Sequence, residues 1–154
     1  MNQEKLNVVS VSGGKDSAAL LLLAIERGAK FEAVFADTGH EHQQTYEYLD
    51  YLREAVSPIR VIRADFTRNF EVRRANLRAL WGKDGISYER IERALARLVP
   101  TGIPMLDLCM LKGRFPSSQA RFCTQELKVF PMQQQIVIPA LRTGSAVTQW
   151  VGVR

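Results

Sequence analysis

The chain has 154 residues, which is long enough for one domain with a hydrophobic core. Hydrophobic residues make up 46% of it and charged residues 24%, which excludes disorder of the whole chain. The formal net charge of +5 suits an anionic ligand, but it does not distinguish a nucleotide from a nucleic acid or from a simple effect on solubility.

Signals for secretion and for membrane insertion are missing. The N-terminus lacks the basic region followed by a long apolar region that a signal peptide has, and the longest purely apolar run, 18–25, is far shorter than the roughly 20 residues that span a bilayer. The two cysteines, Cys109 and Cys123, are too few for a disulfide framework. We therefore expect a cytoplasmic protein without a membrane partner.

The first third of the chain alternates between strand-like and helix-like segments. The expected order is a strand at 6–11, a helix at 17–27, a strand at 31–36, a helix at 43–56 and a strand at 59–62. Short connections between such elements indicate an α/β fold with a parallel sheet and right-handed crossovers. Ligands of parallel sheets bind at the carboxyl ends of the strands, which is where the glycine-containing loops 12–17 and 37–39 both fall.

The rest of the chain differs in character. Residues 66–100 form a predicted helical insertion, a candidate lid, within a single domain spanning 1–154, because 91–99 has apolar residues at the spacing of an amphipathic helix. Residues 101–128 contain glycine, proline and both cysteines, so we expect them to be rich in loops. A helix over 129–141, with Pro131 near its start, and a strand over 146–153 complete the predicted fold.

The arginines of the insertion have two interpretations. They are Arg68, Arg73, Arg74, Arg78, Arg90, Arg93 and Arg97. Clustered arginine is typical of nucleic-acid binding. Interspersed acids, namely Glu71, Glu89 and Glu92, and the scarcity of aromatic residues favour a solvated helix face instead. A nucleic-acid partner therefore rests on charge alone.

The loop 12–17, Ser-Gly-Gly-Lys-Asp-Ser, predicts a phosphate-binding site between a strand and a helix. Consecutive glycines let backbone N–H groups converge on an anion, and the helix N-terminus adds free N–H groups and the positive end of its dipole. Lys15 supplies a positive charge, Ser17 can cap the helix or donate to a phosphate, and Asp16 can hold a magnesium ion. The loop is neither a Walker A motif nor a Gly-x-Gly-x-x-Gly motif.

Four segments of the sequence resemble one family. The loop 12–17 after an N-terminal strand resembles the PP-loop of the adenine nucleotide α-hydrolase superfamily, and Ala-Asp-Thr-Gly-His-Glu at 36–41, with Thr45, resembles the Asp-Thr-Gly segment of phosphoadenosine phosphosulfate (PAPS) reductase-like proteins within it. Residues 121–131 resemble that family's Cys-x-x-x-Leu-Lys-x-x-Pro stretch, and 150–154 resemble the strand with its Gly-x-Arg. The chain looks nearest to the short members found in phages and prophages.

The resemblance implies a Rossmann-like PP-loop fold, and ATP or a sulfonucleotide such as PAPS or adenylyl sulfate (APS) as the substrate, with Mg²⁺. It implies that Ser12, Gly13, Gly14, Lys15, Asp16 and Ser17 contact phosphates, that Asp37, Thr38 and Gly39 lie beside the adenosine, and that Arg121, Lys128 and Arg154 neutralise sulfate or phosphate oxygens. The catalytic candidates are Lys15, Asp16 and Cys123, and Asp16 is also the metal candidate.

The sequence departs from the reductases in its cysteines. Members with an iron–sulfur cluster have adjacent cysteines and a later Cys-x-x-Cys, whereas Phe122 precedes Cys123 here and no Cys-x-x-Cys exists, so we do not expect a cluster. The cysteine-containing tail of members without a cluster is also missing. The family's Gly-x-Arg continues beyond the position of Arg154, which indicates a chain truncated at its C-terminus or an unusually short protein. Cys123 is either a nucleophile or ligand, with Arg121 and Lys128 nearby in sequence to favour the thiolate, or a partly buried structural cysteine.

Three functions follow from these observations. The first is an enzyme that transfers the adenylyl group of ATP with release of pyrophosphate, or that transfers sulfur from a sulfonucleotide to a thiol. The second is a nucleotide-binding subunit of a multi-protein sulfur-transfer or DNA-modification system, without activity alone, which would require a protein partner. The third, a nucleic-acid-binding protein, has only the charge in its favour.

Overall fold

The structure is a computed structural model that describes residues 5–152. The chain divides into two compact units, one formed by residues 1–64 and 124–154 and the other by residues 65–123. No helix in the described range is both long enough and apolar enough to cross a bilayer.

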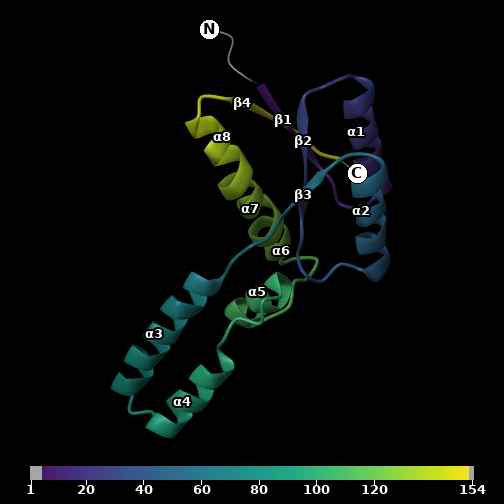
Figure 1. Cartoon of the computed structure of the whole chain (residues 1–154). Coiled ribbons are helices and arrows are strands. Elements are labelled where there is room, and N and C mark those ends of the chain that lie inside the picture. Colours follow the sequence, from purple (N-terminus) through teal and green to yellow (C-terminus); the bar gives the residue numbers. More distant parts are fainter. Residues whose placement is uncertain (1–4, 153–154) are drawn as a thin grey trace. The chain divides into compact units, whose positions relative to one another are not determined.

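The first unit contains a four-stranded parallel sheet. Its strands are β1 (Lys5–Ser10), β2 (Phe31–Ala36), β3 (Ile59–Ile62) and β4 (Ala146–Trp150), in the order β3-β2-β1-β4 (Figure 1). The predicted α/β fold with a parallel sheet is confirmed. The last strand ends at Trp150, earlier than predicted, and residue 153 lies outside the described range.

Each face of the sheet carries a core of buried side chains. Because side chains alternate along a strand, Val9 packs with the helices α1 (Lys15–Glu26) and α2 (Gln43–Ala55), while its neighbour Val8 packs with the C-terminal helix on the opposite face. Figure 1 shows these helices on the two sides of the sheet. Leu21 of α1 and Met132 of the C-terminal helix are buried in the two cores.

The C-terminal helix is a continuous run of helical turns that contains two π-helical segments. It consists of α6 (Phe122–Thr124), η1 (Gln125–Val129), α7 (Phe130–Met132), η2 (Gln133–Val137) and α8 (Ile138–Arg142). The N–H of Phe130 donates to the carbonyl of Gln125, and the N–H of Ile138 donates to that of Gln133. A proline follows each of these donors and has no N–H of its own, so the wide turns accommodate residues that would interrupt an α-helix. The helix therefore begins before the predicted position 129.

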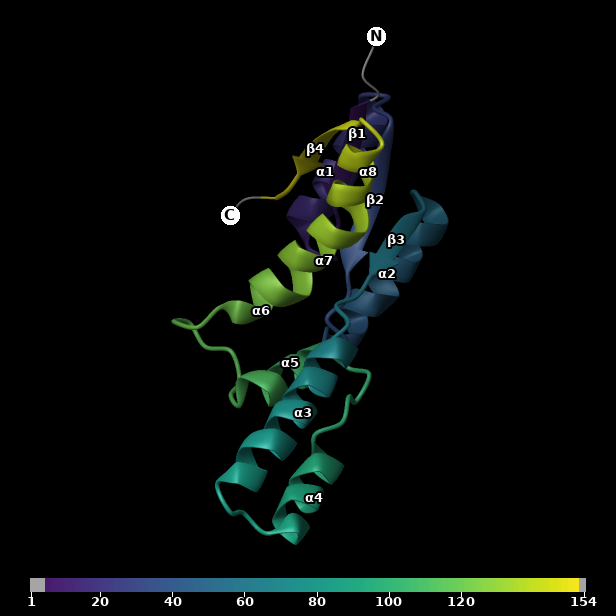
Figure 2. The ribbon, with the colours of Figure 1, turned by 90° about the vertical axis from the view of Figure 1, so that its left-hand side faces the viewer.

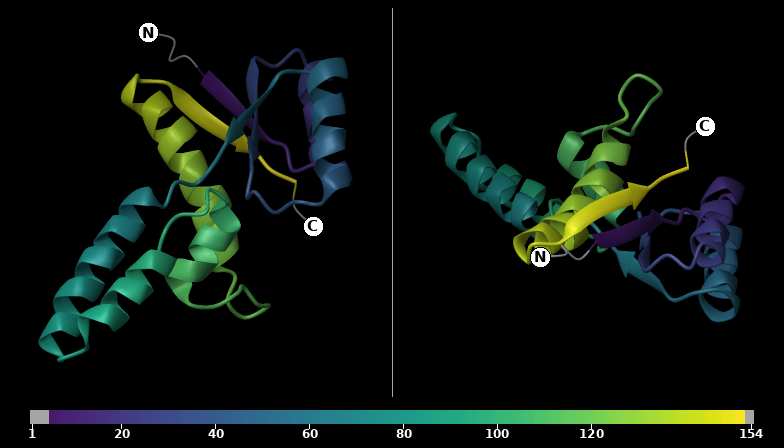
Figure 3. Two further views of the ribbon diagram at one scale, coloured as in Figure 1. Left: turned by 60° about the horizontal axis from the view of Figure 1, so that its bottom comes forward. Right: turned by 90° about the horizontal axis from the view of Figure 1, so that it is seen from above.

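The second unit is helical. Its elements are α3 (Thr67–Lys83), α4 (Tyr88–Arg97) and α5 (Pro104–Lys112). Figures 2 and 3 show α3 and α4 side by side as a hairpin. Phe70 of α3 and Ile91 and Leu95 of α4 are buried. Both helices fall within the range 66–100, but the compact unit extends to residue 123. The role of this segment as a lid stays a prediction.

The helix α5 corrects the prediction that residues 101–128 are mainly loops. Proline stands at its first position, where an N–H is not needed, and Gly113 ends it with φ of 67° in the left-handed region. Asp107 of α5 is buried and accepts hydrogen bonds from the amide and the hydroxyl of Thr101, both at 2.7 Å.

Candidate functional site

The loop after β1 is closed by a serine at its end. Ser17 is only 5% exposed, its hydroxyl donates to the carbonyl of Gly14 at 2.8 Å, and it accepts a hydrogen bond from the amide of Ser12 at 3.0 Å. Gly14 is the N-cap of α1 and no side chain caps this helix, so the predicted capping role of Ser17 is wrong. Ser17 stabilises the loop from the inside instead.

The first glycine of the loop is required for two independent reasons. Gly13 has φ of +74°, a conformation that residues with a Cβ rarely adopt. A Cβ at this position would also lie 2.7 Å from Cγ2 of Thr45 on α2. The backbone of the loop therefore packs directly against α2, and this close approach keeps the turn in place.

A pocket of about 410 Å³ opens beside this loop, at the carboxyl ends of the strands. Its walls come from the loop, the end of β2, the C-terminal helix and the segment after β4, and the predicted site residues among them are Ser12, Gly14, Asp16, Ser17 and Lys128. Apolar side chains, including Val34, Phe35 and Met132, line the remainder. The size and the mixture of apolar walls with a few polar groups are typical of small-molecule sites. Gly13 and Lys15 are not part of the lining, and Lys15 is exposed.

The segment after β4 lies against the start of α1. A Cβ on Gly152 would be 3.2 Å from Cβ of Asp16 and 3.7 Å from the amide nitrogen of Ser17. Gly152 belongs to the predicted Gly-x-Arg, so this part of the motif lies beside the glycine loop. Arg154 falls outside the described residues, and its predicted contact with an anion stays a prediction.

A buried carboxylate organises the turn after β2. Asp37 is 3% exposed. Its Oδ1 accepts hydrogen bonds from the Gly39 amide and the Tyr46 hydroxyl, both at 2.8 Å, and its Oδ2 accepts from Nε of Arg63 at 2.8 Å and from Nη2 of the same guanidinium. Burial by itself would raise the pKa of Asp37, but the hydrogen bonds from Gly39, Arg63 and Tyr46 outweigh it and hold the pKa below its usual value.

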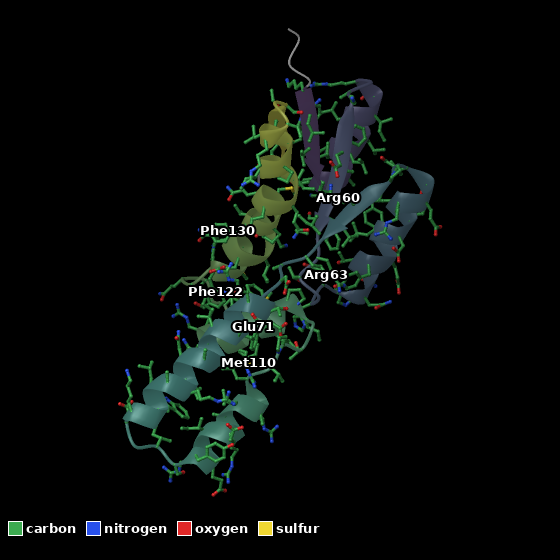
Figure 4. All side chains as sticks on the ribbon, turned by 60° about the vertical axis from the view of Figure 1, so that its left-hand side comes forward. Arg60, Arg63, Glu71, Met110, Phe122 and Phe130 are labelled. Atoms are coloured by element: carbon green, nitrogen blue, oxygen red, sulfur yellow. The ribbon has the colours of Figure 1, made fainter. Side chains whose placement is uncertain are left out.

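The sequence did not identify Arg63 as a site residue, because its position beside Asp37 depends on the register of the sheet. Ala36 and Ile62 pair in the sheet, so the residues that follow them, Asp37 and Arg63, emerge side by side at its carboxyl edge. Figure 4 labels Arg63. Tyr46 of α2 also belongs to this site, because its hydroxyl donates to Asp37. Both carboxylate oxygens of Asp37 are thus occupied by groups of the protein, which fits a role in shaping the turn.

A second polar chain links this turn to the C-terminal helix. The hydroxyl of Thr38, which is 3% exposed, donates to Oε1 of Glu41 at 2.9 Å. The same oxygen lies 3.8 Å from Nζ of Lys128, which lines the pocket. The Lys128 side chain is 46% exposed, so this long ion pair is weak and leaves the ammonium available to an anion in the pocket.

The remaining predicted residues, Arg121 and Cys123, belong to the second unit. Arg121 is exposed and its Nε donates to the carbonyl of Ser118 at 3.3 Å. Phe122, labelled in Figure 4, has the cationic groups of Lys112 and Arg114 at 5.9 and 5.7 Å from its ring centre. Cys123 is half-buried, and burial together with the nearby Cys123 thiol raises the pKa of the buried Cys109.

The four-stranded parallel sheet, with a glycine loop and a pocket at its carboxyl edge, defines a Rossmann-like α/β protein. Residues 6–154 match the family model described as the phosphoadenosine phosphosulfate reductase domain, and the chain belongs to this family.

Two curated relatives come from phages. One, described as "Uncharacterized 37.8 kDa protein in gpa 5'region" of Escherichia phage 186, is 50% identical over 161 residues, covering 99% of this chain and 48% of the relative. Another, described as "Uncharacterized nin region protein ORF290" of Escherichia phage lambda, is 31% identical over 156 residues, covering 97% of this chain and 48% of the relative. The chain spans about half the length of these relatives, in agreement with the predicted similarity to phage proteins.

Proposed function

We propose that the pocket binds an adenine nucleotide and that the protein acts either on ATP at its α-phosphate or on a sulfonucleotide. The observation that carries this proposal is the pocket of about 410 Å³ lined by both the glycine loop and Lys128. Its volume suits one nucleotide. The start of α1 offers backbone N–H groups and a positive dipole end to phosphates, and Lys15 and Lys128 add charge.

In the reaction with ATP, the residues of the chain bind and orient the nucleotide. The loop holds the phosphates, and the turn shaped by Asp37 borders the adenosine. A nucleophile of the acceptor forms a bond to the α-phosphorus, the bond from that phosphorus to the bridging oxygen breaks, and pyrophosphate leaves with the electron pair. The acceptor's proton passes to solvent. Lys15 and the loop amides stabilise the charge that develops on the phosphates.

In the reaction with a sulfonucleotide, the sulfur centre is the electrophile. A thiolate, which we assign to Cys123, forms a bond to the sulfate sulfur, and the bond from this sulfur to the phosphate oxygen breaks. The adenosine phosphate leaves with the electron pair. Arg121 and Lys128 are the cations proposed to neutralise the sulfate or phosphate oxygens.

The residues present fit a nucleotide-bound magnesium ion. Magnesium is usually held by one or two carboxylates together with substrate phosphates, and Asp16 supplies one carboxylate on the pocket wall. Among the described residues there is no group of three or more His, Cys, Asp or Glu side chains that could hold a metal ion by themselves. The ion would reduce the negative charge of the phosphates. The two cysteines of the chain do not fit an iron–sulfur cluster, which needs four protein ligands.

A second candidate function is a nucleotide-binding subunit that works with a protein partner in sulfur transfer or DNA modification. The small number of thiols favours it, because a reductase cycle uses a second thiol to release the product from the first. The length of the curated relatives, about twice the matched region, agrees with further segments being needed for activity.

Calorimetric titration of the full chain with ATP, APS and PAPS, each with and without Mg²⁺, tests the proposal. Lys15→Ala should weaken the binding of the preferred nucleotide by at least about tenfold, equivalent to about 1.4 kcal/mol. Lys5→Ala is the matched control, because Lys5 is exposed at the opposite end of β1. Equal affinities of the wild type and the Lys15→Ala variant would refute the role of the loop.

The titrations also separate the candidate reactions. Mg²⁺-dependent binding of ATP would support adenylyl transfer, which release of pyrophosphate would then measure. Preference for APS or PAPS would support sulfur transfer, and Cys123→Ser should then abolish turnover while leaving affinity nearly unchanged. Binding without turnover would support the subunit, and binding of no nucleotide would overturn the proposal.

A further inference from the structure

The net charge of the protein is confined to one of its two units. Residues 65–123 contain eleven Lys or Arg and six Asp or Glu, which gives a net charge of +5. The other unit contains ten of each kind and is neutral. The positive charge of the chain is therefore a property of the helical unit and is separate from the unit that contains the glycine loop.

Within this unit, two arginines of α3 form contacts inside the α3–α4 hairpin. Nη1 of Arg74 donates to the carbonyl of Leu98 at 2.9 Å and also to that of Leu95, and Nη2 of Arg78 lies 3.2 Å from Glu92. These contacts run in opposite directions along the two helices, so α3 and α4 are antiparallel. They also show which surfaces of the two helices face each other. The facing position is Arg74 on α3 and the buried Ile91 on α4.

Helical geometry then places four arginines on one side of the hairpin. In an antiparallel pair, a step of one residue back from the facing position turns toward the same side in both helices. Arg73 and Arg90 each stand one residue before a facing position, and Arg93 and Arg97 follow Arg90 at i+3 and i+7 along the same side of α4. We call Arg73, Arg90, Arg93 and Arg97 the basic face.

The acidic residues of the hairpin do not neutralise this face. Glu71, labelled on α3 in Figure 4, and Glu92 fall on the opposite side by the same geometry. Among the described residues, Arg93 alone of this face has an acidic partner, Glu89 at 2.8 Å, and this pair is highly exposed. The side chains of Arg73, Arg90 and Arg97 are exposed and make no hydrogen bond or ion pair within the described range 5–152.

We propose that the basic face binds the phosphate backbone of a nucleic acid. Arg90, Arg93 and Arg97 form a row of about 10 Å along α4 at 1.5 Å per residue, and duplex DNA carries about one negative charge per 1.7 Å of its axis. Guanidinium groups are suited to paired hydrogen bonds with phosphate oxygens. The proposal does not depend on the nucleotide proposal, because no residue of the basic face belongs to the pocket.

Fluorescence anisotropy with a labelled DNA duplex of about 20 base pairs and mixed sequence tests the proposal on the full chain, between about 50 and 200 mM salt. The variant Arg73→Gln/Arg90→Gln/Arg97→Gln removes three contacts. The slope of log affinity against log salt should fall in magnitude by about 2.7, and the affinity at about 100 mM salt should fall at least tenfold. Glutamine keeps the helix propensity close to that of arginine.

The matched control is Lys5→Gln/Arg27→Gln/Arg142→Gln, which removes the same charge from exposed positions of the neutral unit. It should retain nearly the wild-type affinity and slope. Equal losses in the two variants would overturn the proposal, as would a wild-type protein that does not bind the duplex at about 50 mM salt. Failure of the wild type to bind the duplex would instead favour an acidic protein as the partner of the basic face.

Two further measurements keep the test decisive. Circular dichroism checks that the triple variant is folded, and if it is not, Arg90→Gln/Arg97→Gln should still reduce the slope by about 1.8. Calorimetry with ATP on the same variants should match the wild type. Loss of duplex binding with unchanged nucleotide binding then supports this proposal, whatever the outcome for the glycine loop.

Discussion

The buried carboxylate of Asp37 provides the most specific test of the site geometry. Asp37→Asn preserves the shape of the side chain and one acceptor oxygen, but it removes the negative charge and places an NH₂ group where an oxygen accepted hydrogen bonds. In the wild type, Oδ1 accepts hydrogen bonds from Gly39 and Tyr46, and Oδ2 accepts from Arg63. The substitution therefore acts on three parts of the chain that meet at this carboxylate.

The expected loss of stability follows from these contacts. Hydrogen bonds to a charged group each contribute about 1.5–3 kcal/mol, but the Arg63 side chain is 57% exposed, so solvent weakens its share. We expect Asp37→Asn to lower the free energy of unfolding by about 2–3 kcal/mol. For a chain of this length that corresponds to a decrease of roughly 5–10 °C in the melting temperature.

The direction of the Asp37 pKa shift determines how the loss of stability in Asp37→Asn depends on pH. The pKa of Asp37 in the folded protein is below the usual 3.8, so the charged carboxylate stabilises the fold at all pH values above the unfolded pKa. This stabilisation is lost as the pH falls through the lower, folded pKa. The difference in stability between the wild type and Asp37→Asn should therefore be constant near neutral pH and become smaller below about pH 4.

Urea denaturation followed by circular dichroism, from neutral pH to about pH 3, measures both quantities. The matched control is Asp50→Asn, because Asp50 forms an exposed pair with Arg53 in which the two side chains are 64% and 42% exposed. We expect a change below about 0.5 kcal/mol for it. A difference for Asp37→Asn that is as small as the control, or that does not change with pH, would refute the assigned hydrogen bonds.

Three other predictions concern the loop and the cysteines. Gly13→Ala should destabilise the protein by at least about 1–2 kcal/mol in thermal denaturation, because of its positive φ and the contact with Thr45, and a neutral effect would contradict the loop conformation. Ser17→Ala should cost about 1–3 kcal/mol, since the Ser12 amide loses its acceptor; unchanged urea midpoints would argue against it. Iodoacetamide at pH 8 should alkylate the half-buried Cys123 before the buried Cys109, because burial raises the pKa of Cys109. Mass spectrometry measures the order of modification, and the reverse order would contradict the burial of the two cysteines.

The sheet could be predicted from the sequence because its signals are local. Strands and helices alternate over 6–62 with glycine-containing turns, and short connections leave few arrangements other than a parallel sheet. The position of the loop followed directly from the end of β1. In contrast, the pairing of Asp37 with Arg63 depends on the register between β2 and β3, which no local pattern contains.

The helix α5 was missed although its ends carried the usual signals. Pro104 and Gly113 are separated by a short apolar stretch without the periodicity of an amphipathic helix, so they were interpreted as loop residues. The stretch is buried on several sides, with Leu108 and Cys109 both in the interior. Burial from several directions removes the polar face on which a periodicity argument depends.

The prolines of the C-terminal helix explain why one face of it can line the pocket over such a long interval. Thr124, Lys128 and Gln133 all border the pocket. In a regular α-helix, nine residues correspond to a rotation of about 900°, which would place Thr124 and Gln133 on opposite faces. The π-helical turn at 125–129 lies between these two residues; it rotates less per residue and so brings the two side chains closer to one face. Pro131, which suggested a helix start in the sequence, instead follows a wide turn that directs Lys128 into the candidate site.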